Sequence, residues 1–113
     1  MACAFEVHNQ LGPGFVEKIY EEAMAQELRG HDIAFERQKQ INVLYKGRQI
    51  GIHRLDMVVE NKIILELKAA SQLVDIHKQQ TLSYLKATGL PLGILLNFGT
   101  SRVQNIRIAN TKR

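Results

Sequence analysis

The spacing of hydrophobic positions predicts three helices in this chain. Apolar residues recur every three or four positions from about 15 to 29, the periodicity of one helix face, and Gly30 is placed to end that helix. A short helix over residues 1–10 is expected to precede it, because the glycines and proline of residues 11–14 must interrupt a helix. A third helix is expected from about residue 73 to residue 88.

The middle and the end of the chain alternate between apolar and polar residues, which predicts strands. Alternation begins soon after the second helix, turns at Lys46-Gly47-Arg48, and continues in a strand over residues 49–59. Gly51 in that strand marks a bulge or a bend. A short apolar strand over residues 92–97 and an edge strand over residues 103–109 follow the third helix.

The hairpin that turns at Glu60-Asn61-Lys62 is the most informative stretch. Residues 55–59 before the turn and 63–67 after it are mostly apolar, which is typical of strands buried on both faces. A buried charge is costly unless it is paired or coordinates a metal. Three charged residues nevertheless interrupt the apolar composition: Asp56, Glu66 and Lys68.

The register of this hairpin decides what the charges can do. A three-residue turn centred on Asn61 places Asp56 opposite Glu66, and Glu66 and Lys68 share a face because side chains alternate. The other face is then expected to carry Leu55, Met57, Leu65 and Leu67. Two ionised carboxylates about 4 Å apart repel by about 1 kcal/mol in water and about 4 kcal/mol at an effective dielectric near 20. Two explanations stay open: a structural ion pair with Lys68, or a bound divalent cation such as Mg²⁺.

These residues also carry a resemblance. Asp56, a run of about ten residues and Glu66-Leu-Lys68 resemble the core motif of the PD-(D/E)XK nuclease superfamily. More closely, Gly14-Phe-Val-Glu17-Lys-Ile-Tyr20 resembles the name motif of the GxxExxY family, which is grouped with that superfamily. The similarity covers nearly the whole chain and continues through Tyr45-Lys-Gly47, Glu66-Leu-Lys-Ala69, His77, Gln80-x-x-x-Tyr84, Leu85-Lys-Ala-Thr-Gly89 and Asn97-Phe-Gly99.

The resemblance implies a fold and an activity. The fold is α/β (α+β), with a restriction-endonuclease-like core in which helices flank a mixed β-sheet, in one domain over residues 1–113. Strand 92–97 is then a parallel neighbour of strand 63–68, because a helix connects the two. The implied activity is hydrolysis of phosphodiester bonds in DNA or RNA by a nuclease that depends on Mg²⁺ or Mn²⁺.

The resemblance also implies roles for particular residues. The expected catalytic residues are Asp56, Glu66, Lys68 and Gln80. The expected metal ligands are Glu17, Asp56, Glu66 and the backbone carbonyl of Leu67. The expected substrate contacts are Arg54, Tyr84, His77 and Tyr20. Purely structural explanations stay open for three of these residues. Glu17 could be a carboxylate that a helix N-terminus favours, Tyr20 could be a packed core residue, and His77 could belong to a polar edge of its helix.

Composition sets the remaining bounds. The chain is 45% hydrophobic, which is too apolar for a disordered chain, and no apolar run approaches the roughly 20 residues of a membrane helix. The single Cys3 excludes an internal disulfide and a cysteine zinc cluster, and favours the cytoplasm. A net charge of +4 permits nucleic-acid contact. The alternative function is an inactive nuclease-fold module that binds nucleic acid or a protein partner, and a homodimer is plausible for either.

Overall fold

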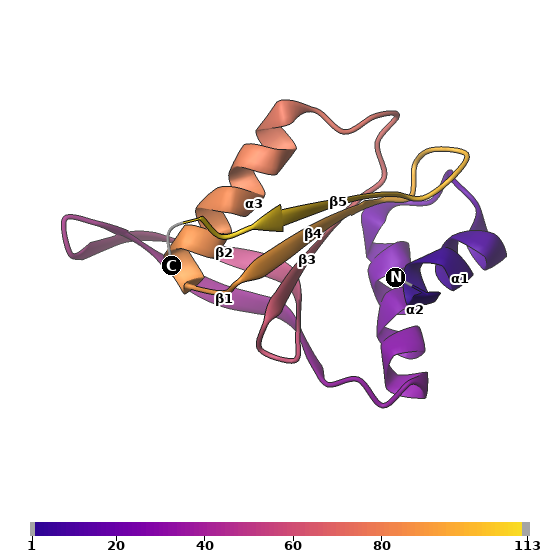
Figure 1. Cartoon of the computed structure of the whole chain (residues 1–113), viewed down its shortest axis with the longest axis horizontal. Helices are drawn as coiled ribbons and strands as arrows, with labels where there is room; N and C mark the ends of the chain where they lie inside the picture. The colour runs from indigo at the N-terminus through magenta and orange to yellow at the C-terminus, as the bar shows by residue number, and fades with distance from the viewer. Residues whose placement is uncertain (1, 112–113) are drawn as a thin grey trace.

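The computed structural model describes residues 2–111, and this part of the chain forms three helices and five strands (Figure 1). The helices are α1 (Ala2–Leu11), α2 (Glu17–Gly30) and α3 (Asp75–Thr88). The strands are β1 (Phe35–Tyr45), β2 (Arg48–Val59), β3 (Ile63–Lys68), β4 (Leu92–Asn97) and β5 (Gln104–Ala109). Every element expected from the sequence is present in its expected order.

The five strands form one mixed sheet in the order β1-β2-β3-β4-β5. Strands β3 and β4 are parallel, with Lys68 beside Asn97, and α3 provides the crossover between them. The other three neighbouring pairs are antiparallel. This arrangement confirms the predicted α+β fold with a mixed sheet and the predicted parallel pair.

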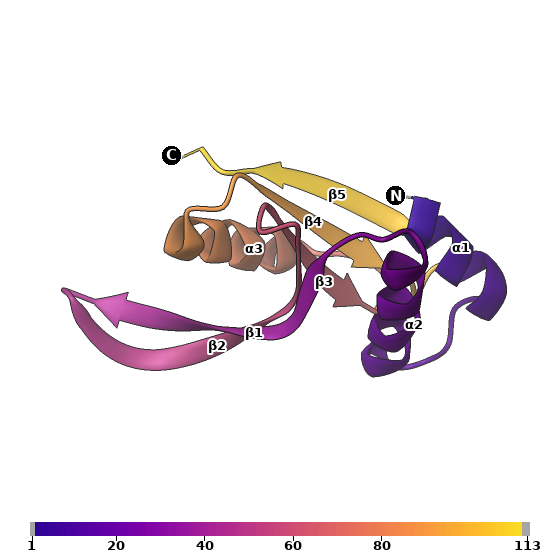
Figure 2. The ribbon, with the colours of Figure 1, turned by 90° about the horizontal axis from the view of Figure 1, so that it is seen from below.

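Helices cover both faces of the sheet (Figure 2). On one face, α1 and α2 pack over an apolar cluster that includes Tyr20, Met57, Leu67 and Phe98. On the other face, α3 packs over a smaller cluster of buried residues: Leu55, Val58, Ile64 and Leu85. The close approach of α3 explains Gly93 in β4, since a Cβ atom there would lie 2.6 Å from Cγ2 of Thr81. No helix of the described residues is both long and apolar enough to cross a membrane.

The β2–β3 hairpin has the predicted register, since Val59 lies opposite Ile63 and the turn residues Glu60 and Asn61 adopt positive φ angles. One expectation for its faces was wrong. Leu55 packs in the cluster on the α3 side, whereas Met57 packs under α2.

The reason for this difference is a break in the β1–β2 ladder. Arg37 pairs with Met57 and Lys39 pairs with Leu55, but Gln38 and Asp56 between them are not paired, and Gln38 has a φ of 50°. A non-glycine residue in this region departs from strand geometry. The strand therefore rotates at Asp56, so that side chains two positions apart no longer share a face.

Smaller differences concern helix ends. Gly89 ends α3 in the left-handed conformation, as its position in the sequence predicts. Gly30, however, is the last residue of α2 rather than its cap, and the cap position is His31. The third helix begins at Asp75, two residues later than expected.

The outer part of the β1–β2 hairpin extends well beyond the body of the molecule (Figure 1). Here the pairing shifts register, with Val43 opposite Gly51 and Leu44 opposite Gln49, so Ile50 is an extra residue on β2. This is the bulge that Gly51 predicts. Residues 40–54, which make up this extension, are called the hairpin arm below.

Candidate active site

Two carboxylates from neighbouring strands meet where the β2–β3 ladder ends. The last paired residues are Met57 and Leu65. Beyond them, the backbone N–H of Asp56 donates to Oε2 of Glu66 over 2.9 Å, and the N–H of Leu67 donates to Oδ2 of Asp56 over 2.8 Å. Each carboxylate thus replaces a ladder bond on the opposite strand, and Asp56 and Glu66 lie next to each other although the strand pairing ends one pair earlier.

The two carboxylates lack a direct counterion. Burial raises the pKa of Asp56, and burial followed by the charge of Asp56 raises the pKa of Glu66 to about 7. The charge of Lys68 lowers both pKa values, but Lys68 forms no salt bridge with any described residue. The structural ion pair is therefore not the arrangement that these side chains adopt, and the charges stay largely uncompensated.

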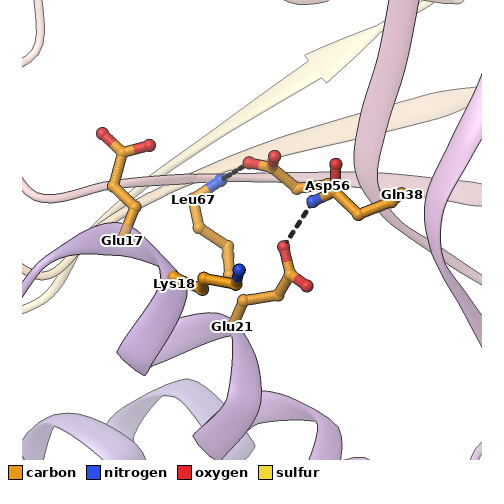
Figure 3. A pocket seen from close by; sticks show the side chains of 6 residues that line it. All are labelled: Glu17, Lys18, Glu21, Gln38, Asp56 and Leu67. Carbon is orange, nitrogen blue, oxygen red and sulfur yellow. Dashed lines mark hydrogen bonds between the residues drawn. The ribbon is translucent and has the colours of Figure 1, made fainter.

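A cavity of about 390 Å³ opens beside Asp56 (Figure 3). It is lined by Glu17, Lys18, Glu21, Gln38, Asp56 and Leu67. Glu17 is the first residue of α2 and is exposed, and its charge contributes to the raised pKa values of both Asp56 and Glu66. The helix therefore brings Glu17 toward the carboxylate pair, as expected, while Glu66 and Lys68 lie outside the lining of this cavity.

Two cavity residues were not identified from the sequence. Glu21 is only 7% exposed and accepts hydrogen bonds from Nε of Arg37 over 2.9 Å and from Nε2 of Gln38 over 2.6 Å. The sequence does indicate Glu21 in one respect: it lies four residues after Glu17, so the two carboxylates share one face of α2. Gln38 gave no comparable signal, because its place in the site follows from the break in the β1–β2 ladder.

On the α3 side, Tyr84 lies near the carboxylates. Burial raises its pKa, and the charges of Glu66 and Asp56 raise it further. Its ring stacks on His53 with 4.2 Å between the ring centroids. Nε2 of His53 is buried and has no hydrogen-bond partner among the described residues, a feature that sequence analysis did not identify.

The other two residues expected on α3, Gln80 and His77, make no hydrogen bond to the carboxylates. Gln80 is exposed one turn before Tyr84 and makes no hydrogen bond within the described part of the chain. His77 accepts a hydrogen bond at Nδ1 from the N–H of Val74 over 3.3 Å, which places it at the helix start. The structure therefore brings Tyr84 to the pair but gives His77 a local role.

Tyr20 does not fit the expected substrate contact. Its side chain is fully buried, stacks on Phe98 with centroids 4.6 Å apart, and donates from its hydroxyl to the carbonyl of Gly12 over 2.6 Å. It also accepts from the N–H of Phe15 over 3.2 Å. We correct the expectation: Tyr20 anchors the loop in which Gly14 adopts a φ of 116°, and this loop sets the start of α2 at Glu17.

Arg54 lies on the side of the hairpin arm opposite α3. Its neighbours His53 and Leu55 both pack toward α3, so alternation turns the exposed Arg54 to the other face. Arg54 pairs with Gln40, and Gln38 and Asp56, two positions farther toward the body of the molecule, line the cavity together with residues of α2.

The Asn97-Phe98-Gly99 segment supports the end of β3. Oδ1 of the fully buried Asn97 accepts from the N–H of Ala70 over 2.9 Å, and Nδ2 donates to the carbonyl of Ala70 over 3.0 Å. A Cβ atom on Gly99 would lie 2.3 Å from the same carbonyl oxygen, so only glycine fits. The segment holds the chain directly after Lys68.

The donor set fits a divalent cation held by two carboxylates. Mg²⁺ usually keeps several waters and takes one or two carboxylates. Oδ1 of Asp56 and Oε1 of Glu66 make no hydrogen bond with the described residues, so each carboxylate has a free oxygen. In residues 2–111, no three or more His, Cys, Asp or Glu side chains group closely enough to hold a metal. Glu17 is therefore not a third direct ligand in this arrangement.

Comparisons with known proteins agree with this geometry. The model of the PD-(D/E)XK nuclease superfamily matches residues 1–108. A crystal structure of the protein SSO0001 is similar over 82% of this chain, at 20% identity and a TM-score of 0.61, and the chain spans about half the length of that protein, 49%. A crystal structure of an alkaline exonuclease (LHK-Exo) from Laribacter hongkongensis is similar over 96% of this chain and 68% of its own, at 10% identity and a TM-score of 0.61. No curated protein matches the sequence. The family match covers almost the whole sequence, and the chain belongs to the PD-(D/E)XK nuclease superfamily.

Proposed function

We propose that this chain is a metal-dependent nuclease of the GxxExxY type that hydrolyses phosphodiester bonds in nucleic acid. The observation that carries the proposal is the Asp56–Glu66 pair, in which Glu66 is buried and Asp56 half-buried at the end of two paired strands, without a direct counterion. Such a pair costs folding free energy. Binding of a cation between the carboxylates explains why they are placed together, whereas side-chain packing does not explain it.

Asp56, Glu66 and the backbone carbonyl of Leu67 would hold Mg²⁺ or Mn²⁺, with Glu17 facing the same cavity. When bound, a hard divalent cation polarises a phosphate group and lowers the pKa of water. The two carboxylates supply the negative charge that such a cation needs, and the free oxygens Oδ1 and Oε1 are the groups we assign to it.

The remaining roles follow from charge and position. Hydrolysis adds a water oxygen to phosphorus and breaks one P–O bond, while negative charge builds on the phosphate oxygens. Lys68, directly after the carboxylates in β3, would offset that charge or position the water. Arg54 would contact a neighbouring phosphate. Gln80 and Tyr84 would orient substrate from α3, and His77 would be an accessory contact.

One observation favours the alternative of an inactive binding module. Each carboxylate accepts a backbone N–H bond from the opposite strand, which a purely structural network would also show. A module of this kind would bind nucleic acid or a protein partner without using a metal.

A metal titration separates the two functions. Thermal unfolding of the wild type and of Asp56→Ala should be followed while Mg²⁺ or Mn²⁺ is added, beside cleavage of labelled DNA and RNA. The nuclease should be stabilised by the metal and should cleave, and both effects should be lost in Asp56→Ala and in the Asp56→Ala/Glu66→Ala double variant. Glu60→Gln, which changes an exposed turn glutamate, is the matched control. Binding of nucleic acid without cleavage, together with no stabilisation by the metal, would leave only the inactive module.

The choice between DNA and RNA, a homodimer and a cytoplasmic location stay predictions. The last rests on the single cysteine of the sequence.

A further inference from the structure

The hairpin arm lies within a stretch of the chain that contains no acidic residue. Residues 37–55 contain five of the fifteen Lys and Arg residues and none of the eleven Asp and Glu residues. Residues 76–113 also contain no acidic residue and have six Lys and Arg residues, so the arm is one of two basic parts of the chain, and a control variant must test the other.

The cations of this stretch without a salt bridge to a described residue lie in the arm, two at its tip and one at its inner end. Arg37 forms salt bridges with Glu21 and Glu22, and Lys39 forms one with Glu36. By contrast, three cations of the arm form no salt bridge within residues 2–111: Lys46, Arg48 and Arg54. Their charge is therefore available to a partner.

The face of the arm that carries Arg54 runs into the candidate active site. Arg54 pairs with Gln40, and Asn42 pairs with Ile52 farther out, while Gln38 and Asp56 come next in the opposite direction. Gln40, Asn42 and Arg54 are exposed. A track of amides and a guanidinium thus leads from the cavity beside Asp56 toward the tip of the arm.

The tip combines these polar groups with exposed apolar side chains. The side chains of Leu44, Tyr45 and Ile50 are 62%, 60% and 67% exposed. At about 3.3 Å per residue, the six residues from Gln40 to Tyr45 span roughly 20 Å, a length over which duplex DNA carries about twelve phosphates. A two-stranded ribbon also fits the major groove of B-form DNA, whereas the deep, narrow groove of duplex RNA does not admit one.

We propose that the hairpin arm binds duplex DNA, with Lys46, Arg48 and Arg54 on phosphates, and holds the duplex across the cavity beside Asp56. Like charges at Lys46, Arg48 and Arg54 disfavour packing of the arm against a second copy of itself, so charge complementarity selects a polyanion as the partner. The proposal rests on the proposed nuclease function and adds the substrate class and the surface that binds it.

The test is fluorescence anisotropy with a labelled 20-base-pair DNA duplex in EDTA, which measures binding without cleavage. The arm variant is Lys46→Gln/Arg48→Gln/Arg54→Gln. The matched control, Lys62→Gln/Lys86→Gln/Arg102→Gln, removes the same charge from exposed positions outside the arm. Circular dichroism of both variants establishes that each is folded.

The arm variant should bind at least tenfold more weakly than the wild type at 0.1 M salt. The slope of log K against log salt should fall by about 2.7, since each phosphate contact contributes about 0.9. The control should stay within twofold of the wild type. Equal losses in both triple variants would overturn the proposal, because binding would then follow net charge alone.

Four further outcomes are decisive. Asp56→Asn should bind at least as tightly as the wild type in EDTA, because it removes a charge that repels phosphate, and a loss of binding there would move the DNA site from the arm to the carboxylates. Competition by duplex RNA as strong as by duplex DNA would overturn the assignment to DNA. A dimer in sedimentation that Ile50→Ser/Ile52→Ser dissociates, with DNA affinity unchanged, would assign the arm to a second copy. Binding of DNA by the wild type without any cleavage would refute the proposed nuclease function but not the proposal that the arm binds DNA.

Discussion

Neutralising Glu66 should stabilise the metal-free protein at alkaline pH. Glu66 is 5% exposed, and burial together with the charge of Asp56 raises its pKa from 4.5 in the unfolded chain to about 7 in the fold. The folded state therefore holds its proton more tightly than the unfolded state. Stability falls as pH rises between 4.5 and about 7, because over this range the unfolded chain has lost the proton and the folded chain has not.

The size of this effect follows from the same shift. One pKa unit corresponds to about 1.4 kcal/mol, so the fold loses about 3 kcal/mol from Glu66 once the pH exceeds 7. Glu66→Gln keeps the shape of the side chain, and its amide oxygen can still accept from the N–H of Asp56. The variant should therefore be more stable than the wild type by up to about 3 kcal/mol at pH 8 in EDTA. At pH 4.5 the difference should vanish.

Urea unfolding followed by circular dichroism, at pH 4.5, 6 and 8 in EDTA, measures these free energies of unfolding. In thermal scans the expected shift at pH 8 is roughly 10 °C. Glu60→Gln, in the exposed turn between β2 and β3, should show no such dependence. A Glu66→Gln protein that is less stable than the wild type at pH 8, or a difference equal at all three pH values, would refute the reasoning.

Three further predictions follow from individual contacts. Lys68→Ala should lower the cleavage rate while metal binding, measured by calorimetry, is retained; full cleavage by the variant would remove Lys68 from the chemistry. Gly99→Ala should cost about 1–3 kcal/mol in urea unfolding, because its Cβ atom would overlap the backbone of Ala70, whereas Gly30→Ala has open space and should be neutral or stabilising. Tyr20→Phe should cost about 1–2 kcal/mol through its lost hydroxyl bonds and leave kcat/KM unchanged below the unfolding temperature; a drop in kcat/KM without destabilisation would restore Tyr20 as a substrate contact.

Local patterns were sufficient to predict the hairpin register and with it the carboxylate pair. The turn at Glu60 and Asn61 and the apolar strands around it leave one pairing that keeps both faces buried. The parallel neighbour of β3 was also predictable, because a helix between two strands requires a crossover. These features depend on residues that are close in the sequence or follow a single period.

The break at Gln38 and Asp56 could not be predicted, because strand periodicity assumes an uninterrupted ladder. It changes which face Leu55 occupies and brings Gln38 to Glu21 over 2.6 Å. The unpartnered Nε2 of His53 escapes prediction for a similar reason, since it depends on how α3 packs on the arm. The break in the ladder and the environment of His53 both depend on packing between distant parts of the chain, so no single residue type predicts them.

The charges of the β1–β2 hairpin imply that binding and cleavage have different requirements. Asp56 and Glu66 repel a phosphate group, whereas Arg54, two residues before Asp56, attracts one. Over a few ångströms near a protein surface, each such interaction amounts to several kcal/mol. Without a cation, the carboxylates therefore keep phosphates away from themselves, and the arm must provide the attraction that holds DNA. A divalent cation between the two carboxylates cancels their negative charge and lets a phosphate approach. DNA should therefore bind through the arm without metal and in a salt-dependent way, while cleavage should require the metal as well.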